Sequence, residues 1–180
     1  MTITQIDFAI LDALYNLLHC KFCDFFFTTI TKFGDAGIYW ILLSLLLIFS
    51  KKTRRFGLVM LITIGVCFIS YDLVIKNLVG RLRPYQQNPM FQIIIPEPHG
   101  SSFPSGHSAI SFCAASLHFL FRKECEYAKK YWIPNTVLAF LIMISRLYLY
   151  VHFPTDVLCG ALLGIVFGIC GYKISERIHK

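Results

Sequence analysis

The stretch SRLYLYVHFPTD, residues 145–156, lies between two long apolar runs and places Arg146, His152 and Asp156 within twelve positions. Charged side chains beside sequence long enough to cross a membrane are costly, and they often mark a functional site. A histidine followed four residues later by an aspartate could act as a nucleophile or base with its orienting carboxylate, while the arginine could bind an anion. The alternative is an interfacial ion pair that caps a helix.

The composition predicts an integral membrane protein. The 180 residues are 56% hydrophobic and have a mean hydropathy of +0.62, which is too apolar for a soluble domain of this length. We therefore expect an all-α fold, in which a single domain over residues 1–180 forms a helical bundle in the membrane.

The basic residues are placed as membrane topology requires, although a net charge of +7 could also suggest nucleic-acid binding. Most of them form three clusters between or after apolar runs: Lys51, Lys52, Arg54 and Arg55; Arg122, Lys123, Lys129 and Lys130; and Lys173, Arg177 and Lys180. Such clusters are typical of cytoplasmic loops. We therefore expect no nucleic-acid partner.

The apolar runs predict about five transmembrane helices, at residues 36–50, 56–75, 105–121, 132–150 and 156–174, which together form a bundle over residues 36–174. Before them, residues 1–34 contain amphipathic patterns at 5–19 and 22–33, which predict two interfacial helices that lie on the membrane. With the basic clusters inside, the N-terminus lies outside and the C-terminus inside. The ends of the second and fourth spans and the starts of the third and fifth then meet at the outer face.

The segment KNLVGRLRP, residues 76–84, ends the second predicted span. Lys76 and Arg83 are seven residues apart, which places them on nearly the same face of a helix, where both could contact one anion. Arg81 lies off that face, and we expect it to meet lipid headgroups or water. The alternative is a juxtamembrane basic anchor without a catalytic role.

The segment SSFPSGHSAIS, residues 101–111, begins the third predicted span. Ser105 and Gly106 stand where the helix starts, and the free N–H groups there form a phosphate site to which glycine allows close approach. His107 follows at once and could give a proton to a leaving oxygen. A plain helix cap with an interfacial histidine is the alternative. In the opening stretch, Pro154 suits the first turn of the fifth span, from which Asp156 can reach His152.

The order of these motifs, KX6RP, PSGH and SRX5HX3D, resembles that of the type 2 phosphatidic acid phosphatase (PAP2) superfamily, and every motif position is filled. The resemblance implies that His152 attacks phosphorus to form a phosphohistidine, that Asp156 orients it, and that His107 protonates the leaving group. It also implies a set of residues that bind the phosphate oxygens: Lys76, Arg83, Ser105, Gly106 and Arg146. No metal and no other cofactor is expected.

The resemblance further implies a bacterial lipid phosphatase in the cell membrane, with a multi-pass topology and an active site at the extracytoplasmic face. The candidate substrates are undecaprenyl diphosphate, phosphatidylglycerol phosphate, phosphatidic acid and lipid A 1-phosphate. Two alternatives remain open at this point, a phosphotransferase of the same superfamily and a transporter or binding protein for lipid phosphates. The oligomeric state is left open.

Three further predictions concern residues outside the motifs. Asp72, one turn before Lys76, is expected to pair with it inside the helix. His118 is expected to form a hydrogen bond to another helix. The outer loop at 85–103 contains the apolar segment MFQIII and is expected to contact the lipid tail of the substrate.

Overall fold

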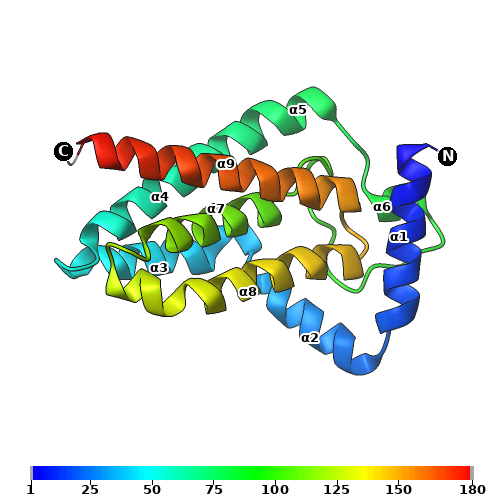
Figure 1. The fold of residues 1–180 in the computed structure, drawn as a ribbon. Coiled ribbons are helices and arrows are strands. Elements are labelled where there is room, and N and C mark those ends of the chain that lie inside the picture. The colour runs from blue at the N-terminus through cyan, green and yellow to red at the C-terminus, as the bar shows by residue number, and fades with distance from the viewer. Residues whose placement is uncertain (1, 179–180) are drawn as a thin grey trace.

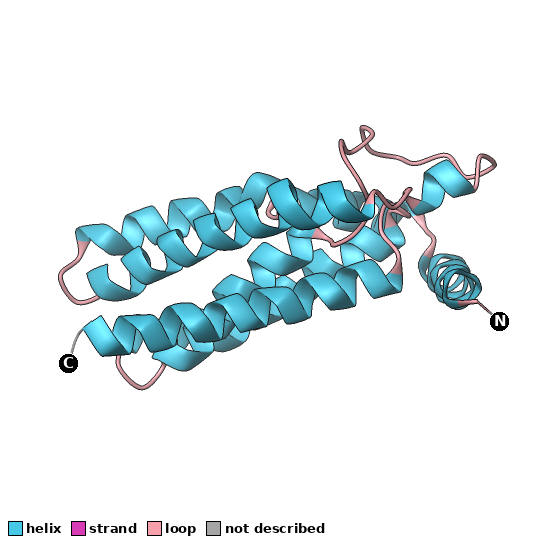
Figure 2. Ribbon diagram, turned by 90° about the horizontal axis from the view of Figure 1, so that it is seen from above, coloured by secondary structure: helices cyan, strands magenta, loops and turns pink. Residues whose placement is uncertain are grey.

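An elongated helical bundle forms the body of the protein in the computed structural model, which describes residues 2–178 (Figure 1). The bundle consists of α3 (Ile38–Phe49), α4 (Arg54–Ile69), α7 (Gly106–Phe121), α8 (Glu126–Tyr148) and α9 (Pro154–Ile178). All regular secondary structure within the described residues is helical (Figure 2). The predicted all-α fold is therefore confirmed.

Helix α7 occupies the centre of the bundle and packs most extensively against α9. Three glycines of α9, Gly160, Gly164 and Gly168, face α7 so closely that a Cβ at any of them would collide with α7, in the first two cases with a backbone carbonyl oxygen. Small residues at this spacing let two helix backbones approach each other directly. The starts of α7 and α9 are thus held together by backbone contact.

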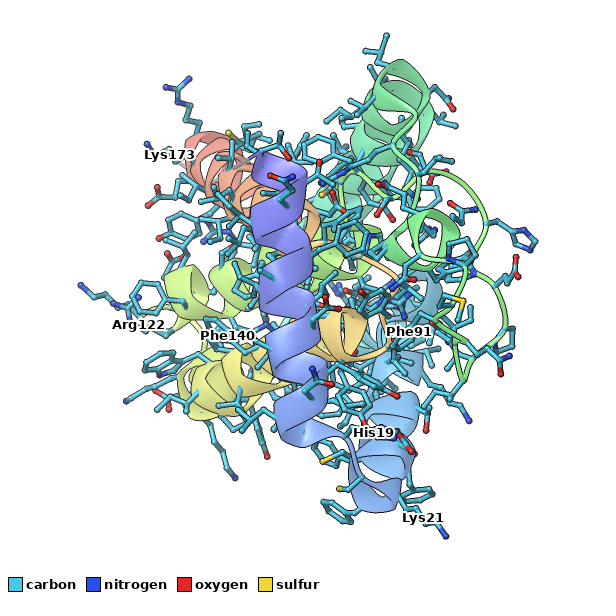
Figure 3. All side chains as sticks on the ribbon, turned by 90° about the vertical axis from the view of Figure 1, so that its right-hand side faces the viewer. His19, Lys21, Phe91, Arg122, Phe140 and Lys173 are labelled. Carbon is cyan, nitrogen blue, oxygen red and sulfur yellow. The ribbon has the colours of Figure 1, made fainter. Side chains whose placement is uncertain are left out.

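Two helices precede the bundle, as the amphipathic patterns predict. Helix α1 (Ile3–Leu18) lies across one end of the bundle, which Figure 3 shows from that end, and α2 (Lys21–Lys32) runs back toward the body of the protein. Helix α1 buries Asp7 and Leu11 against the bundle. A second apolar stripe on the same helix remains exposed: Ile3, Ile6, Ile10 and Leu17.

Within the described residues, fewer helices are long and apolar enough to qualify as membrane spans by themselves than the five predicted. By length and composition, Arg54–Gln87 and Pro154–Ile178 qualify, and α2 joined to Asp35–Phe49 across a 42° bend would add a third. Helix α7 is apolar, but its 16 residues are too few to span a membrane. Helix α8 has 23 residues and begins at Glu126, before the predicted start at residue 132, and it is not apolar enough to qualify as a span. Helix α7 is buried on nearly all sides by its neighbours, so its length is not set by lipid contact.

The two ends of the bundle differ in character. One end has the short connections between α3 and α4 and between α7 and α8, together with the end of α9, and carries the three basic clusters; Lys180 lies outside the described residues (Figure 1). Arg122 and Lys173 point outward there (Figure 3). The opposite end has α1, the long connection before α7, and the turn between α8 and α9 (Figure 2). The candidate site lies at this second end.

Candidate active site

The turn between α8 and α9 is held by its own apolar residues. Helix α8 ends at Tyr148, and Tyr150 turns the chain with a φ of +59°. Tyr148, Tyr150 and Phe153 are fully buried, and Phe91 stacks on Tyr150 with ring centroids 3.9 Å apart. The aromatic side chains of the opening stretch therefore anchor a rigid turn that carries the histidine between them.

His152 lies in a closed polar network. Its Nδ1 is 3.8 Å from Oδ2 of Asp156 and 3.5 Å from Oγ of Ser102, and its Nε2 is 3.2 Å from Nη1 of Arg83. The hydroxyl of Ser102 donates to Oδ2 of Asp156 at 2.5 Å, and so does the backbone N–H of Phe153 at 2.8 Å. Asp156 is thus next to His152 as predicted, with Ser102 bonded to the carboxylate and close to the ring.

The buried position of His152 determines its protonation state. Burial, reinforced by the charges of Arg83 and Arg146 and opposed by Asp156, lowers the pKa of His152 to about 3. The imidazole is therefore neutral at pH 7. Because the guanidinium of Arg83 can only donate to Nε2, the proton of the ring belongs on Nδ1, where the polar network can accept it. The lone pair of Nε2 is then available for attack.

Arg83 reaches this site by a route that helical periodicity did not predict. Gly80, with a φ of +60°, ends helix α5 (Lys76–Val79), and Arg83 follows in extended backbone before α6 (Pro84–Gln87). Arg83 is 3% exposed, and its guanidinium donates to the carbonyl oxygens of Val151 at 2.9 Å and His99 at 3.0 Å. The prediction that Lys76 and Arg83 share one helix face is wrong because the helix stops between them.

Lys76 lies near the start of α7 but is paired inside its own segment. It donates to Asp72 at 2.8 Å, which confirms the predicted partner. Its ammonium also lies 5.2 Å from the ring centroid of Tyr71, and this ring packs so closely on Gly106 that a Cβ there would come within 2.7 Å of it. Tyr71 and Asp72 belong to a π-helical turn, η2 (Ser70–Ile75), a feature frequent at functional sites.

Helix α7 begins where the sequence predicts. Ser105 is its N-cap, and the backbone N–H of Ser105 donates to the carbonyl oxygen of Asp156 at 3.1 Å. His107 stands in the first turn, and its Nε2 is 2.9 Å from Oδ1 of Asp35 in η1 (Asp35–Gly37). Its ring packs on Gly34, where a Cβ would collide with it. The start of α7 therefore places His107 beside a carboxylate that no motif contains.

His107 opens into a cavity of about 430 Å³. One wall is polar and includes Arg146, Asp35 and Thr31, whereas the other is the apolar part of the outer loop: Ile94, Ile95, Pro96 and Pro98. Arg146 is almost fully buried and donates to Thr31, but its buried Nε has no partner among the described residues. A cation with a spare donor beside an apolar wall suits an anion that carries a lipid tail.

Four residues that sequence reasoning did not assign to the site belong to it: Asp7, Asp35, Arg81 and Ser102. The expectation that Arg81 meets lipid or water is wrong, because it forms ion pairs with Asp156 at 2.6 Å and Asp7 at 2.7 Å. His118 was also predicted wrongly, since it bonds Ala114 of its own helix at 2.9 Å. Ser102 and Arg81 had a local signal, because they lie in the segments 101–111 and 76–84, whereas Asp7 and Asp35 had none.

Comparison with known proteins extends the resemblance beyond the motifs. The family model of the PAP2 superfamily matches residues 52–180. An undecaprenyl-diphosphatase from Sulfolobus acidocaldarius is 33% identical over 148 residues, which cover 82% of this chain and 68% of that protein. A lipid A 4'-phosphatase from Bacteroides thetaiotaomicron is 30% identical over 179 residues, which cover 91% of this chain and 75% of that protein.

A solved structure shares the arrangement of helices as well. The crystal structure of a transmembrane PAP2-type phosphatidylglycerolphosphate phosphatase from Bacillus subtilis matches with a TM-score of 0.80 and 30% sequence identity. The match covers 98% of this chain and 87% of that one. The likeness therefore includes α1 and α2 as well as the bundle.

Proposed function

Because the chain belongs to the PAP2 superfamily, we propose that it hydrolyses membrane lipid phosphates or diphosphates through a phosphohistidine intermediate at the extracytoplasmic face. That it is a membrane-embedded lipid phosphatase follows from the family and from its relatives. The observation that supports the mechanism best is the neutral, buried His152, whose Nε2 faces Arg83 while its Nδ1 faces Asp156.

In the first step, Nε2 of His152 attacks phosphorus and the bond to the leaving oxygen breaks. Arg83 now donates to the ring, and we propose that it transfers this bond to a phosphate oxygen when substrate binds. Asp156 balances the positive charge that develops on the ring and keeps the proton on Nδ1. The phosphoryl group is then bonded to His152 as a phosphohistidine.

His107 serves the leaving group in the first step and water in the second. In its protonated form it gives a proton to the departing oxygen as general acid, and the resulting neutral imidazole takes a proton from the water that attacks the phosphohistidine. This attack releases inorganic phosphate and restores His152. The cavity beside His107 has room for the leaving group and later for water, which supports the division of roles between the two histidines.

The negative charge of the phosphoryl group needs several cations or N–H donors. We propose that Arg83 and Arg146 bind its oxygens directly, together with the hydroxyl of Ser105 and the backbone N–H of Gly106, and that Lys76 binds once substrate draws it from Asp72. Fixed donors in a site that excludes water supply strong electrostatic stabilisation of the transition state. The proposed reaction is therefore independent of metal ions.

The shape of the cavity supports a substrate with an apolar tail, such as undecaprenyl diphosphate, phosphatidylglycerol phosphate or phosphatidic acid. Its apolar wall comes from the loop at 85–103, which the sequence predicts to contact the lipid tail. Replacing Ile94 and Ile95, which line the cavity, by serine should raise KM for long-chain lipids more than for a short-chain analogue. Unchanged turnover of both substrates would count against this role of the loop.

We also propose that all five bundle helices cross the membrane, with the site outside and the C-terminus inside. The separation of the basic clusters from the site, at opposite ends of the bundle, supports this orientation (Figure 1). The native cysteines, of which Cys20, Cys159 and Cys170 are exposed, are first replaced by serine or alanine. Labelling of Pro98→Cys in that background by a membrane-impermeant thiol reagent in intact cells, with Glu124→Cys as the inside control, tests the orientation. Labelling of Glu124→Cys alone would mean that the protein has the opposite orientation, with the site inside.

The decisive experiment measures phosphate release by the purified protein in detergent, with EDTA present, from a panel of these lipids. Wild-type protein should release inorganic phosphate, whereas His152→Ala should release almost none. Loss of activity on chelation would overturn the metal-independent mechanism. Transfer of the phosphoryl group to an added acceptor alcohol, without release of inorganic phosphate, would indicate a phosphotransferase. Lipid binding without turnover in both proteins would indicate a binding or transport protein.

A further inference from the structure

The N-terminal helix α1 is joined to the candidate site by one buried carboxylate. Asp7 is 1% exposed, and its Oδ2 accepts from Arg81 at 2.7 Å and from the hydroxyl of Thr155 at 2.6 Å. Its Oδ1 accepts from the backbone N–H of Thr155 at 3.1 Å. These partners, Arg81 and Thr155, both lie directly beside Asp156: Arg81 is its ion-pair partner and Thr155 precedes it in the chain.

Arg81 carries this connection onward to the reacting groups. One guanidinium nitrogen, Nη2, faces Asp7, and the other, Nη1, donates to Oδ1 of Asp156 at 2.6 Å. The guanidinium lies 4.0 Å from the ring centroid of Phe153, and the carbonyl oxygen of Arg81 accepts from the backbone N–H of Ser102 at 2.7 Å. Arg81 therefore braces both Asp156 and the serine that bonds it.

The geometry explains how this brace affects the nucleophile. Asp156 has two oxygens, and Arg81 holds Oδ1 while Oδ2 is turned toward the ring of His152. Fixing one oxygen by a charged donor fixes the plane of the carboxylate, and so the direction from which it meets the ring. A displacement of about 1 Å at such a site can reduce the rate about 10²-fold.

We propose that Asp7 and Arg81 are positioning residues, through which helix α1 holds Asp156 and thereby His152 in the reactive arrangement. The inference rests on the proposed function, because it requires His152 to be the nucleophile. Neither residue is part of the motifs that define the site. Helix α1 is on this view a component of the catalytic centre as well as a membrane-facing element.

A matched pair of variants on α1 tests the inference. Asp12 also ties α1 to the turn between α8 and α9, through Tyr150 at 2.6 Å, but its carboxylate contacts neither Arg81 nor Asp156. We expect Asp7→Ala to lower kcat about 10²-fold with little change in KM, and Asp12→Ala to keep kcat close to the wild-type value. Equal losses in the two variants, or a change in KM alone, would reduce Asp7 to a structural tether.

A second variant guards against a folding defect. Removing Asp7 alone leaves the partly buried guanidinium of Arg81 with one partner fewer, whereas the double variant Asp7→Asn/Arg81→Met removes both charges of that pair and leaves Asp156 with its other donors, Ser102 and the backbone N–H of Phe153. We expect this protein to stay folded, as gel filtration and circular dichroism check, but to lose kcat as Asp7→Ala does. A folded double variant with wild-type kcat would overturn the inference.

The double variant also has a signature that a purely structural role would not produce. His152 faces Arg83, Asp156 and Ser102, with the charge of Arg146 nearby, and all four remain in the double variant. The variant removes the cation that contacts Asp156 and, one contact farther from His152, the anion of Asp7. Asp156 then stabilises protonated His152 more strongly, so the acid limb of the kcat/KM profile should move to higher pH. An unmoved limb would contradict electrostatic positioning.

Including His152→Ala in the same assay separates the two proposals. If His152→Ala keeps its activity, the proposed function fails and the inference fails with it. If His152→Ala is inactive while folded Asp7→Ala turns over like the wild type, only the positioning inference fails.

Discussion

The two histidines of the site occupy opposite kinds of surroundings. His152 is 3% exposed and is enclosed by Arg83, Ser102 and Asp156. His107, by contrast, lines a cavity of about 430 Å³, where its partner Asp35 keeps a side chain that is 60% exposed. One ring is fixed within the protein, and the other faces space that a substrate can enter.

The difference fits the role that we propose for each histidine. A nucleophile must meet one atom, phosphorus, from one direction, so a closed network serves it well. A general acid that later activates water must meet two different molecules in turn, so it needs access. The contrast between the histidines therefore predicts different responses to mutation.

The largest effect is expected for His152→Ala, which removes the atom that would bond phosphorus. Phosphate release should fall about 10⁴–10⁶-fold for every substrate, whatever its leaving group. Measurement of initial rates in detergent, with gel filtration to confirm the fold, checks this. Turnover close to that of the wild type would mean that another residue is the nucleophile.

A smaller and substrate-dependent loss is expected for His107→Ala. Loss of general acid catalysis should cost about 10²–10⁴-fold on phosphatidylglycerol phosphate, whose leaving alkoxide needs a proton. The same variant should lose far less on p-nitrophenyl phosphate, because nitrophenolate leaves without one. Equal losses on the two substrates would mean that the histidines do not differ in role.

The closed surroundings of His152 also predict how stability depends on pH. The unfolded chain takes up a proton at this residue below a pKa of about 6.5, but the folded protein does not until about pH 3. Stability from the neutral ring is therefore present above pH 6.5 and is lost as the pH falls toward 3, by about 2 kcal/mol at pH 5. Thermal unfolding in detergent at pH 7 and pH 5 measures it. A His152→Gln variant should lack this contribution, so an identical pH dependence would contradict the assignment.

The smallest effect is expected for Asp35→Asn, on the open side. The variant weakens one hydrogen bond to His107 near solvent and should lower kcat about tenfold on phosphatidylglycerol phosphate. Asp24→Asn on α2, whose carboxylate accepts from Tyr148 at 2.6 Å, is the matched control. A loss in the control as large as that in Asp35→Asn would indicate general loosening of this side.

The parts of the site that sequence could predict are local ones. His152 and Asp156 are four residues apart, and Gly106 and His107 occupy the first turn of α7, so short-range geometry alone brings their groups together. The prediction for Arg81 failed because it extended a helix through Gly80, whereas Gly80 ends that helix and turns the chain. Asp7 bonds a residue 74 positions away, and no periodicity in one sequence encodes such a contact.

The sequence likewise predicted the general features of the fold but not all of its details. Helical class, two leading helices and the meeting of the catalytic segments at one end all follow from apolar periodicity and charge. The five predicted spans are not all recovered by the length and composition of the observed helices, because hydropathy treats every apolar run as facing lipid. Helix α7 faces protein almost everywhere, and α8 carries polar residues in its first half, so neither matches the simple pattern.

The glycine contact between α7 and α9 has a consequence for substrate exchange. Because the two backbones touch, α7 and α9 form one packed unit that carries the segments of His107 and Asp156, and Asp7 ties α1 to it. We expect lipid entry and product exit to come from motion of α2 and the outer loop around this unit. We therefore expect the rate of exchange to depend on the surrounding membrane, while the chemical step remains insensitive to it.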